Sequence, residues 1–216
     1  MKNVAVILAG CGVFDGAEIN EAVLTLLHIE KNNAKYFCFA PNREQLHVID
    51  HLKGEAVEES RNILTEAARI ARGNIKALDE LDASEFDALI IPGGFGAAKN
   101  LCNFAVEGTN ASIQSDVETA IKAFADQKKP IGYMCIAPAL VPFVHAADTE
   151  ITIGTDADTA SALEQLGAKH VNCPVDDIVV DMEAKVVTTP AYMLAGSIMD
   201  AEKGISKLVE KVISLA

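Results

Sequence analysis

The sequence predicts a three-layer α/β sandwich with a mainly parallel central sheet. Four short segments are apolar throughout and lack the polar alternation of a half-exposed strand: residues 4–8, 36–40, 88–91 and 131–134. Strands that are apolar on both sides need helices on both faces of their sheet. Segments with helical periodicity lie between and after these strands, at residues 17–30, 62–71, 113–125 and 137–144. This alternation of strand and helix is the pattern of the α/β class.

The first helix and the segment after the second strand have distinct patterns. The helix carries Ile19, Val23, Leu26 and Leu27 on one apolar stripe, which is expected to face the core. Residues 42–60 are polar and less periodic. We expect them to form a surface insertion with its own short helix.

The end of the chain departs from the strand–helix alternation. Residues 178–180 and 185–188 flank the segment "DMEA", which predicts an antiparallel β-hairpin with a charged turn. An amphipathic helix over residues 195–215 follows. With no repeat and no linker in the sequence, residues 1–216 are expected to form a single domain.

Composition excludes several classes of function. The chain has 18 basic and 31 acidic residues, a net charge of −13, which argues against nucleic acid as a partner. Its longest apolar runs are too short to span a membrane. The N-terminal residues lead directly into a strand-like run without a charged leader, so a cytoplasmic location is expected. Five cysteines without a C-x-x-C spacing predict neither a disulfide framework nor a metal site.

Three stretches that follow predicted strands should converge, because sites in this class lie at the carboxyl ends of the strands. In "GYMCIAPA", residues 132–139, Cys135 stands at a sharp strand-to-helix turn. The amides and the dipole of a helix start stabilise a thiolate and lower its pKa. The alternative is an ordinary buried thiol.

The second stretch, "PGGFG", places Gly93 and Gly94 after a strand. Their amides can turn towards a neighbouring strand end and hold a developing oxyanion. The alternative is a common glycine-rich turn. A phosphate-binding loop is excluded, since no G-K-[ST] motif occurs.

The third stretch, "AGCGVFDGAEINEAV", residues 9–23, contains three acidic residues. Asp15 and Glu18 fit a capping pair at the helix start. Glu21 lies one turn further, beside the apolar stripe, and must face solvent or a polar pocket. If it reaches the Cys135 sulfur, it is suited to general acid–base catalysis. The alternative is a plain exposed helix position.

The segments "DGAEINEAV", "IIPGGFG", "GYMCIAPA" and "VDDIVVDMEAKVVTTPA" occur in this order. Together they resemble the PfpI and class I glutamine amidotransferase-like superfamily, in particular its ElbB type, described as isoprenoid-biosynthesis-associated with glyoxalase activity. The resemblance implies a flavodoxin-like fold, with Cys135 as the nucleophile at the strand-to-helix turn and Glu21 as the carboxylate that contacts it. It also implies oxyanion contacts from the amides of Gly93, Gly94 and Ile136.

The sequence departs from its relatives at the positions of a third catalytic residue. Many relatives have a histidine directly after the nucleophilic cysteine, where this chain has Ile136. Glutaminases carry a distal His-x-Glu pair, whereas His170 is followed by Val171 and Asn172. A Cys–His–Glu triad, and with it glutamine hydrolysis, is therefore disfavoured, and a Cys–Glu dyad remains.

The expected function is that of a cofactor-independent glyoxalase. Cys135 would attack a small dicarbonyl, glyoxal or methylglyoxal, to give a hemithioacetal, and Glu21 would move the proton between carbons to form the 2-hydroxy acid. No metal and no glutathione is required, and turnover is expected to be slow. The alternative is a non-enzymatic, redox-responsive or partner-binding protein. We further expect a homodimer and six secondary pocket residues: Cys11, Glu18, Asn100, Thr189, Pro190 and Tyr192.

Overall fold

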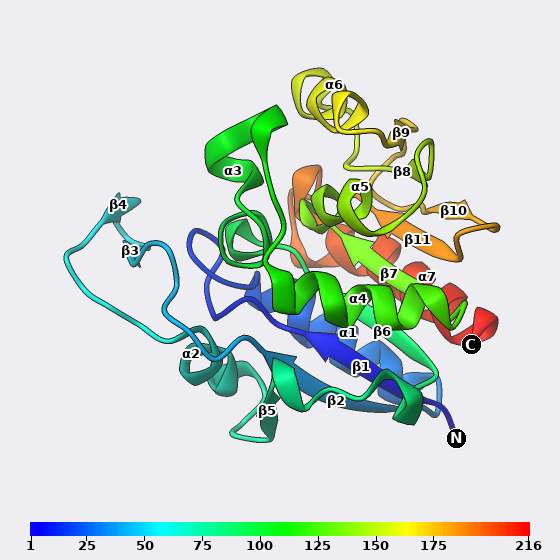
Figure 1. The fold of residues 1–216 in the computed structure, drawn as a ribbon, viewed down its shortest axis with the longest axis horizontal. Helices are drawn as coiled ribbons and strands as arrows, with labels where there is room; N and C mark the ends of the chain where they lie inside the picture. Colours follow the sequence, from blue (N-terminus) through cyan, green and yellow to red (C-terminus); the bar gives the residue numbers. More distant parts are fainter.

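The structure, a computed structural model, describes residues 1–216 and is built around a sheet of seven strands (Figure 1). Their spatial order is β10-β11-β7-β6-β1-β2-β5, and every pair is parallel except β10 with β11. The strands are β1 (Asn3–Ile7), β2 (Lys35–Ala40), β5 (Ile75–Ala77), β6 (Ala88–Ile91), β7 (Ile131–Met134), β10 (Val179–Asp181) and β11 (Val186–Thr189). The predicted mainly parallel sheet and C-terminal hairpin are confirmed. The short edge strand β5 was not predicted.

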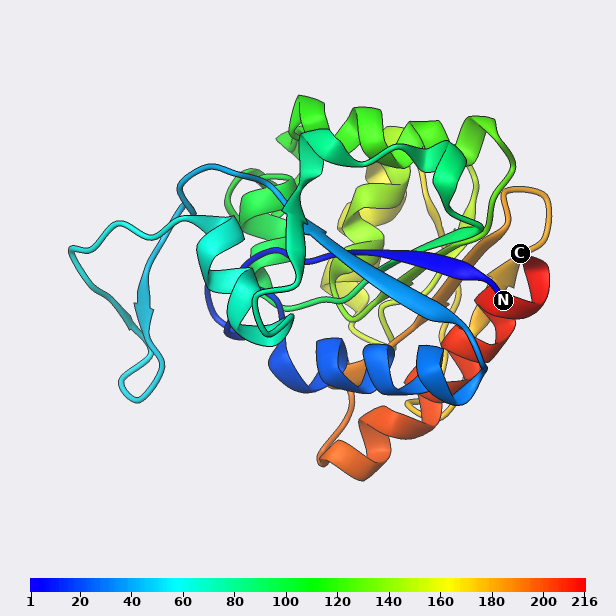
Figure 2. The same ribbon diagram turned by 90° about the horizontal axis from the view of Figure 1, so that it is seen from below.

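Helices cover both faces of this sheet. In Figure 2, α1 and α7 lie side by side below the sheet and α4 lies above it. The helices are α1 (Ile19–Lys31), α2 (Ile63–Ile70), α3 (Phe104–Glu107), α4 (Ser115–Asp126), α5 (Val141–Val144), α6 (Ala157–Gln165) and α7 (Ile198–Leu215). The segment before α5 is a 3₁₀ turn over Ala137–Leu140, and Ala97–Leu101 form a π-helical turn. No helix combines the length and the apolar character that crossing a bilayer needs.

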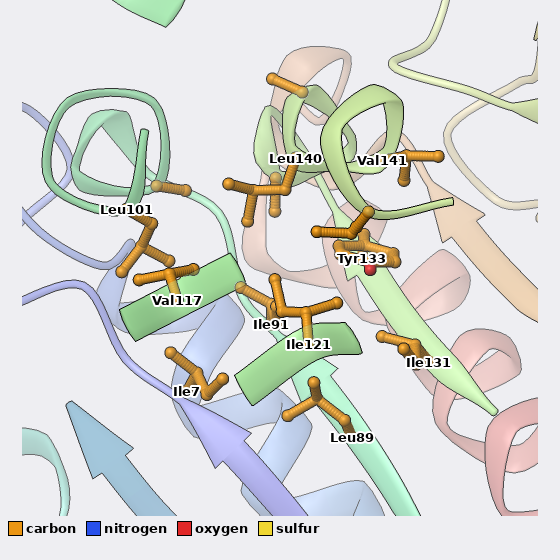
Figure 3. Close-up of a cluster of buried hydrophobic side chains, with 14 of the residues drawn as sticks. Ile7, Leu89, Ile91, Leu101, Val117, Ile121, Ile131, Tyr133, Leu140 and Val141 are labelled. Carbon is orange, nitrogen blue, oxygen red and sulfur yellow. The ribbon is translucent and has the colours of Figure 1, made fainter. Parts of the chain in front are cut away.

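The sheet separates two hydrophobic cores. In β1, Ala5 and Ile7 belong to the core under α4, whereas Val4 and Val6 belong to the core under α1 and α7. Figure 3 shows the first core, in which strand residues pack against α4: Ile7, Leu89, Ile91, Ile131 and Tyr133 against Val117 and Ile121. The central strands β1, β6 and β7 thus bury both faces, which explains their unbroken apolar sequences.

The insertion projects from the body as an arm, the cyan segment of Figure 1. The predicted short helix is wrong: residues 42–60 contain an antiparallel pair, β3 (Ile49–Asp50) and β4 (Glu55–Ala56). The Asp50 carboxylate accepts hydrogen bonds from the amides of Leu52 and Lys53, and Gly54 has a φ of +73°. Aspartate and glycine in these positions favour a turn.

Helix α1 is rotated from the orientation that its apolar stripe predicts. Ile19, Val23 and Leu27 are 42–49% exposed, and only Leu26 of the stripe is buried. The face that packs inward instead contains Glu21, Ala22, Thr25, His28 and Ile29. The Thr25 hydroxyl donates to the Met134 sulfur, and His28 pairs with Glu202 of α7 at 2.8 Å. The partners of Glu21 are described with the site below.

A second small sheet lies beside β10. It pairs β8 (Glu150–Ile151) with β9 (Lys169–His170) in parallel. Helix α6 runs between them and contacts β9, so this unit forms a separate layer next to the main sheet. The first turn of helix α6 lies next to the pocket described below.

Candidate active site

Three loops converge at the carboxyl ends of β1, β6 and β7, as the sequence predicted. The loop after β6 packs directly on the start of α1: the Glu18 amide donates to the Gly93 carbonyl at 3.0 Å, and the Gly96 amide donates to that of Gly16 at 2.9 Å. A Cβ atom on Gly94 would lie 2.4 Å from the Glu18 nitrogen, and its φ is +87°. Only glycine tolerates both constraints.

Cys135 occupies the turn directly after β7. Its φ of 59° is in the left-handed region, which non-glycine residues rarely adopt and which marks functional sites. Its amide donates to the Thr189 carbonyl of β11 at 3.0 Å, which holds the turn in place. The side chain is 7% exposed and lines a pocket.

Glu21 reaches the sulfur of Cys135. It is fully buried, and its two carboxylate oxygens are held by amides from distant parts of the chain. Oε2 accepts from Gly93 at 2.8 Å, and Oε1 accepts from Tyr192 at 3.1 Å. The carboxyl group and the Cys135 side chain lie on either side of Gly93, close enough for each to shift the pKa of the other. Glu21 is therefore not an exposed helix position.

Burial raises the pKa of Glu21 from its ordinary 4.5 to about 7, and the nearby Glu18 contributes to the rise. The amides of Tyr192 and Gly93 act in the opposite direction. A carboxyl group with a pKa near neutrality can both accept and return a proton under physiological conditions.

Burial also raises the pKa of the Cys135 thiol well above its usual value, and the Glu21 charge adds to this. The amides of Gly94 and Ile136 lower it but do not prevail. The predicted net lowering by the helix start is therefore wrong for the resting site, because desolvation and a neighbouring carboxylate oppose it. Cys135 and Glu21 act as a coupled pair that shares one proton near neutral pH.

The oxyanion contacts divide among the three predicted amides. Gly93 donates its N–H to Glu21, so it positions the carboxylate rather than facing a substrate oxygen. A Cβ atom on Gly93 would lie 2.5 Å from the Cys135 Cβ. The amides of Gly94 and Ile136 interact with the Cys135 sulfur and lower its pKa. Of the three predicted amides, these two are not engaged by Glu21, so the oxyanion contact is still expected of them.

Neither Glu18 nor Asp15 has the role expected of it in the capping pair. Glu18 is itself the helix cap: its carboxylate accepts from the Glu21 amide at 2.6 Å. Asp15 is buried and instead accepts from the Ile49 amide of the arm at 2.7 Å. The predicted Asp15 cap is wrong, because Asp15 still lies in the loop closed by the Gly16 to Gly12 hydrogen bond.

Five of the six expected secondary pocket residues do not line the pocket: Cys11, Glu18, Asn100, Thr189 and Pro190. The buried Asn100 side chain donates to the carbonyls of Ala9 and Asp15 and accepts from the Leu46 amide. It thereby joins the first loop to the arm. Cys11 lies close to Glu66 and Arg69 of α2, and all five cysteines are free thiols.

The segment after β11 contributes one side chain to the pocket. Thr189 is fully buried, and its hydroxyl donates to the Asp177 carbonyl at 2.8 Å. Pro190 begins a 3₁₀ turn over Ala191–Met193. This turn directs the Tyr192 amide to Glu21 and places the Tyr192 ring in the pocket wall.

The pocket at Cys135 has a volume of about 310 Å³, and nine of its eleven lining residues are hydrophobic. Seven of the lining residues were not singled out individually from the sequence: Val13, Phe95, Ala98, Phe104, Ala105, Thr159 and Met193. Val13 and Phe95 lie inside the loop motifs, but Phe104, Ala105, Thr159 and Met193 carry no motif. No three His, Cys, Asp or Glu side chains gather where they could hold a metal ion.

No family model matches the chain. Two curated relatives align over 222 residues, which is 98% of this chain in each case. The "ES1 protein homolog, mitochondrial" of Rattus norvegicus is 48% identical, with 83% of its length covered. The "Glutamine amidotransferase-like class 1 domain-containing protein 3, mitochondrial" of Homo sapiens is 47% identical, with 82% covered.

Solved structures extend these similarities. The isoprenoid biosynthesis protein with amidotransferase-like domain from Ehrlichia chaffeensis is 41% identical, with a TM-score of 0.92 over 99% of this chain and 100% of its own. Glyoxalase III from Candida albicans has a TM-score of 0.65 at 16% identity, over 99% of this chain and 97% of its own, and shares the fold alone.

These similarities cover almost the whole chain and include the loops that hold Cys135 and Glu21. They support the superfamily inferred from the sequence motifs but do not single out its ElbB type. By sequence and by structure, the chain belongs to the family of ES1 and glutamine amidotransferase-like class 1 domain-containing proteins.

Proposed function

We propose that this chain is a cofactor-independent glyoxalase that converts glyoxal or methylglyoxal to the 2-hydroxy acid. The observation that carries the proposal is the Cys135–Glu21 pair at the base of an apolar pocket, where the pKa of Glu21 is about 7. Both groups are fixed by backbone amides, so they need little reorganisation during reaction.

The first step is addition of the thiol to an aldehyde carbon. The Cys135 sulfur forms a bond to this carbon while its proton passes to Glu21. The electrons of the C=O π bond move to oxygen, where the amides of Gly94 and Ile136 stabilise the charge. Glu21 then returns the proton to this oxygen, which gives a neutral hemithioacetal and a carboxylate ready to act again.

The second step moves hydrogen between the two carbons. Glu21 removes the C–H proton from the carbon bonded to sulfur, and the electron pair moves to the keto oxygen to give an enediolate. The hydroxyl proton of the hemithioacetal passes to this oxygen. Glu21 then returns its proton to the adjacent carbon while the C=O bond next to sulfur re-forms. The product is a thioester of the 2-hydroxy acid. One water molecule then hydrolyses the C–S bond, releasing the acid and restoring the thiol.

Glutamine hydrolysis is disfavoured by the same pocket. Glutamine carries an ammonium and a carboxylate group, and neither is bound favourably without a charged partner. The pocket lining contains no charged side chain and no histidine. The amidotransferase-like fold is therefore not proposed to act as a glutaminase here.

One observation favours a second candidate, a redox-responsive or partner-binding protein. Glu21 is the only titratable side chain that influences the pKa of Cys135, so the site lacks the histidine base of many relatives. A thiol held in this way can serve as a sensor without turnover. Enzymatic activity is the better supported proposal, because a sensor needs no fully buried carboxyl group beside its sulfur.

The deciding experiment is product analysis with glyoxal. Wild type is expected to form glycolate, and Cys135→Ser is expected to form none above the uncatalysed background. Glu30→Gln, on the exposed side of α1, is the control for handling and folding. Absence of glycolate with wild type would leave the sensor proposal.

The cellular compartment remains a prediction. The sequence favours the cytoplasm, whereas the rat, human and zebrafish relatives are named as mitochondrial proteins. A glyoxalase that needs only water and the dicarbonyl can act in either compartment. Fractionation of cells that express the chain at its natural level, with an antibody to it, tests the prediction.

A further inference from the structure

The pocket is much larger than the smallest dicarbonyl needs. Its volume of about 310 Å³ is about ten times the roughly 30 Å³ that one water molecule takes in the liquid. Glyoxal consists of only two carbonyl groups joined by one bond. Most of the pocket would stay filled with water next to apolar walls if glyoxal were the intended occupant, and that arrangement gains little binding energy.

The walls indicate what the remaining space can hold. Aliphatic and aromatic side chains from four separate segments form them: Val13, Ala98, Phe104, Ala105, Ile136 and Met193. No charged side chain lines the pocket, and the Glu21 carboxyl group lies behind Cys135. An anionic substituent would lose its hydration without gaining a partner. An apolar substituent would gain about fourfold in affinity for each methylene group that it buries.

Two neutral hydroxyl groups are the only hydrogen-bonding side chains of the lining besides the thiol. Tyr192 Oη accepts a hydrogen bond from Asn20 Nδ2 at 3.1 Å, so its own proton remains available. Thr159 lies in the first turn of α6. Its amide and its half-buried hydroxyl both face the Asp156 carboxylate, whose pKa they lower. The free neutral donor is therefore the Tyr192 hydroxyl, and a donor of this kind matches a carbonyl oxygen and not a carboxylate or a phosphate.

We infer that the site is built for neutral 2-oxoaldehydes with a bulky apolar substituent, aryl or branched alkyl. The substituent occupies the space between Phe104, Val13 and Met193, and the Tyr192 hydroxyl donates to the keto oxygen. The aldehyde carbon then lies at the Cys135 sulfur. This inference rests on the proposed function for its chemistry, but the binding preference can be measured without turnover.

The turnover test compares kcat/KM for glyoxal, methylglyoxal, phenylglyoxal and 4-carboxyphenylglyoxal, each corrected with Cys135→Ser. Phenylglyoxal is expected to exceed glyoxal by at least about tenfold. The carboxylate of the last compound is expected to cost at least about tenfold relative to phenylglyoxal, although the two aldehydes are equally reactive to a first approximation. Equal values for all four compounds would overturn the inference and leave the glyoxalase proposal standing.

Two variants locate the preference in this pocket. Tyr192→Phe keeps the ring and the backbone amide and is expected to lower kcat/KM for phenylglyoxal about tenfold by loss of one hydrogen bond. Ala105→Leu narrows the pocket and is expected to lower the ratio of phenylglyoxal to glyoxal turnover. Ala56→Leu, exposed on the arm, is the matched control and should leave that ratio unchanged. An unchanged ratio in Ala105→Leu would place the preference elsewhere and contradict the inference.

The binding test uses aldehydes that lack the second carbonyl group and cannot turn over. Benzaldehyde, acetaldehyde and 4-formylbenzoate compete with iodoacetamide for Cys135, and alkylation is mapped by mass spectrometry. Benzaldehyde is expected to protect at a concentration at least about tenfold lower than either of the others. Stronger protection by benzaldehyde together with no turnover of any dicarbonyl would refute the glyoxalase proposal but retain the pocket preference. Equal protection by all three aldehydes would refute the pocket preference.

Discussion

The two carboxylate oxygens of Glu21 are occupied by backbone donors, one of which is the Gly93 amide at 2.8 Å. The other oxygen accepts from the Tyr192 amide. A glutamine in this position can satisfy only one of these donors, because its NH₂ group would face the other. The site is thus specific for a carboxyl group, whether that group is protonated or ionised.

Glu21→Gln is expected to separate thiol reactivity from catalysis. Loss of the proton-transfer group should lower dicarbonyl turnover by at least about a hundredfold. Alkylation of Cys135 by iodoacetamide at neutral pH should persist, because the variant removes a charge that raises the thiol pKa and keeps the amides of Gly94 and Ile136. Both rates are measured on the same preparation, with Glu30→Gln as the control. Wild-type turnover in Glu21→Gln would exclude the dyad mechanism.

Activity should depend on pH through the shared proton. The pair is reactive once it has lost one of its two protons, whichever group holds the other, so kcat/KM should rise through about pH 7, the pKa of Glu21. The charge of Glu18 contributes to that pKa, and Glu18→Gln should therefore move the midpoint to lower pH. The measurement is a pH–rate profile for both proteins. A midpoint near pH 4.5 in wild type would show that Glu21 is not the titrating group.

Stability should fall as Glu21 ionises. Its folded pKa of about 7 lies above the ordinary value of 4.5, so the folded state binds this proton more tightly than the unfolded state. The contribution is complete below about pH 4.5 and is lost as pH rises through about 7, with a total of about 3 kcal/mol. Urea unfolding at several pH values should show this decline in wild type and a flatter profile in Glu21→Gln. Parallel profiles would contradict the assigned pKa.

Gly93→Ala should disrupt the site with less effect on the rest of the fold. The added Cβ would lie 2.5 Å from the Cys135 Cβ and 2.8 Å from Glu21 Oε2, and neither neighbour is the free end of a flexible side chain. Overpacking of this kind costs about 1–3 kcal/mol in unfolding free energy. Turnover should drop at least about tenfold, since the Glu21 carboxylate loses its position. Gly196→Ala, whose Cβ would meet only Asp200 at 3.8 Å, serves as the control and should keep wild-type activity.

We expect the chain to form a homodimer through the exposed stripe of α1. Ile19, Val23 and Leu27 are large apolar residues that remain 42–49% exposed on one helix face. Light scattering should give twice the monomer mass of 22.9 kDa, and Val23→Lys should shift the protein towards the monomer. A mass of 22.9 kDa for wild type across dilution would contradict this prediction.

The sequence was sufficient for every strand of the main sheet except β5 and for bringing Cys135 and Glu21 forward as a candidate pair. The segments that form β6 and β7 are short and wholly apolar, and this pattern depends only on local residues and on burial of both faces. The motifs around Cys135 and Glu21 likewise lie in contiguous stretches. Properties that depend on neighbours distant in sequence could not be predicted in the same way.

Glu21 illustrates this limit. Its position beside an apolar stripe did not show whether it faced solvent, because the answer depends on donors at residues 93 and 192. The raised pKa of Cys135 depends on the depth of burial, which no local pattern encodes. Thr159 reaches the pocket only because α6 folds back over it, and nothing in its own segment indicates that contact.

The hydrogen bond from the Tyr192 amide to Glu21 also has a consequence for synthesis on the ribosome. Glu21 and Cys135 leave the ribosome well before Tyr192 does, and the Thr189 carbonyl that holds the Cys135 turn is equally late. Because translation is slow relative to local folding, the nascent chain spends time with both reactive residues present but unassembled. The pair acquires its fixed geometry only when β11 joins β7, so a chain terminated before residue 186 would expose a thiol without its partner groups.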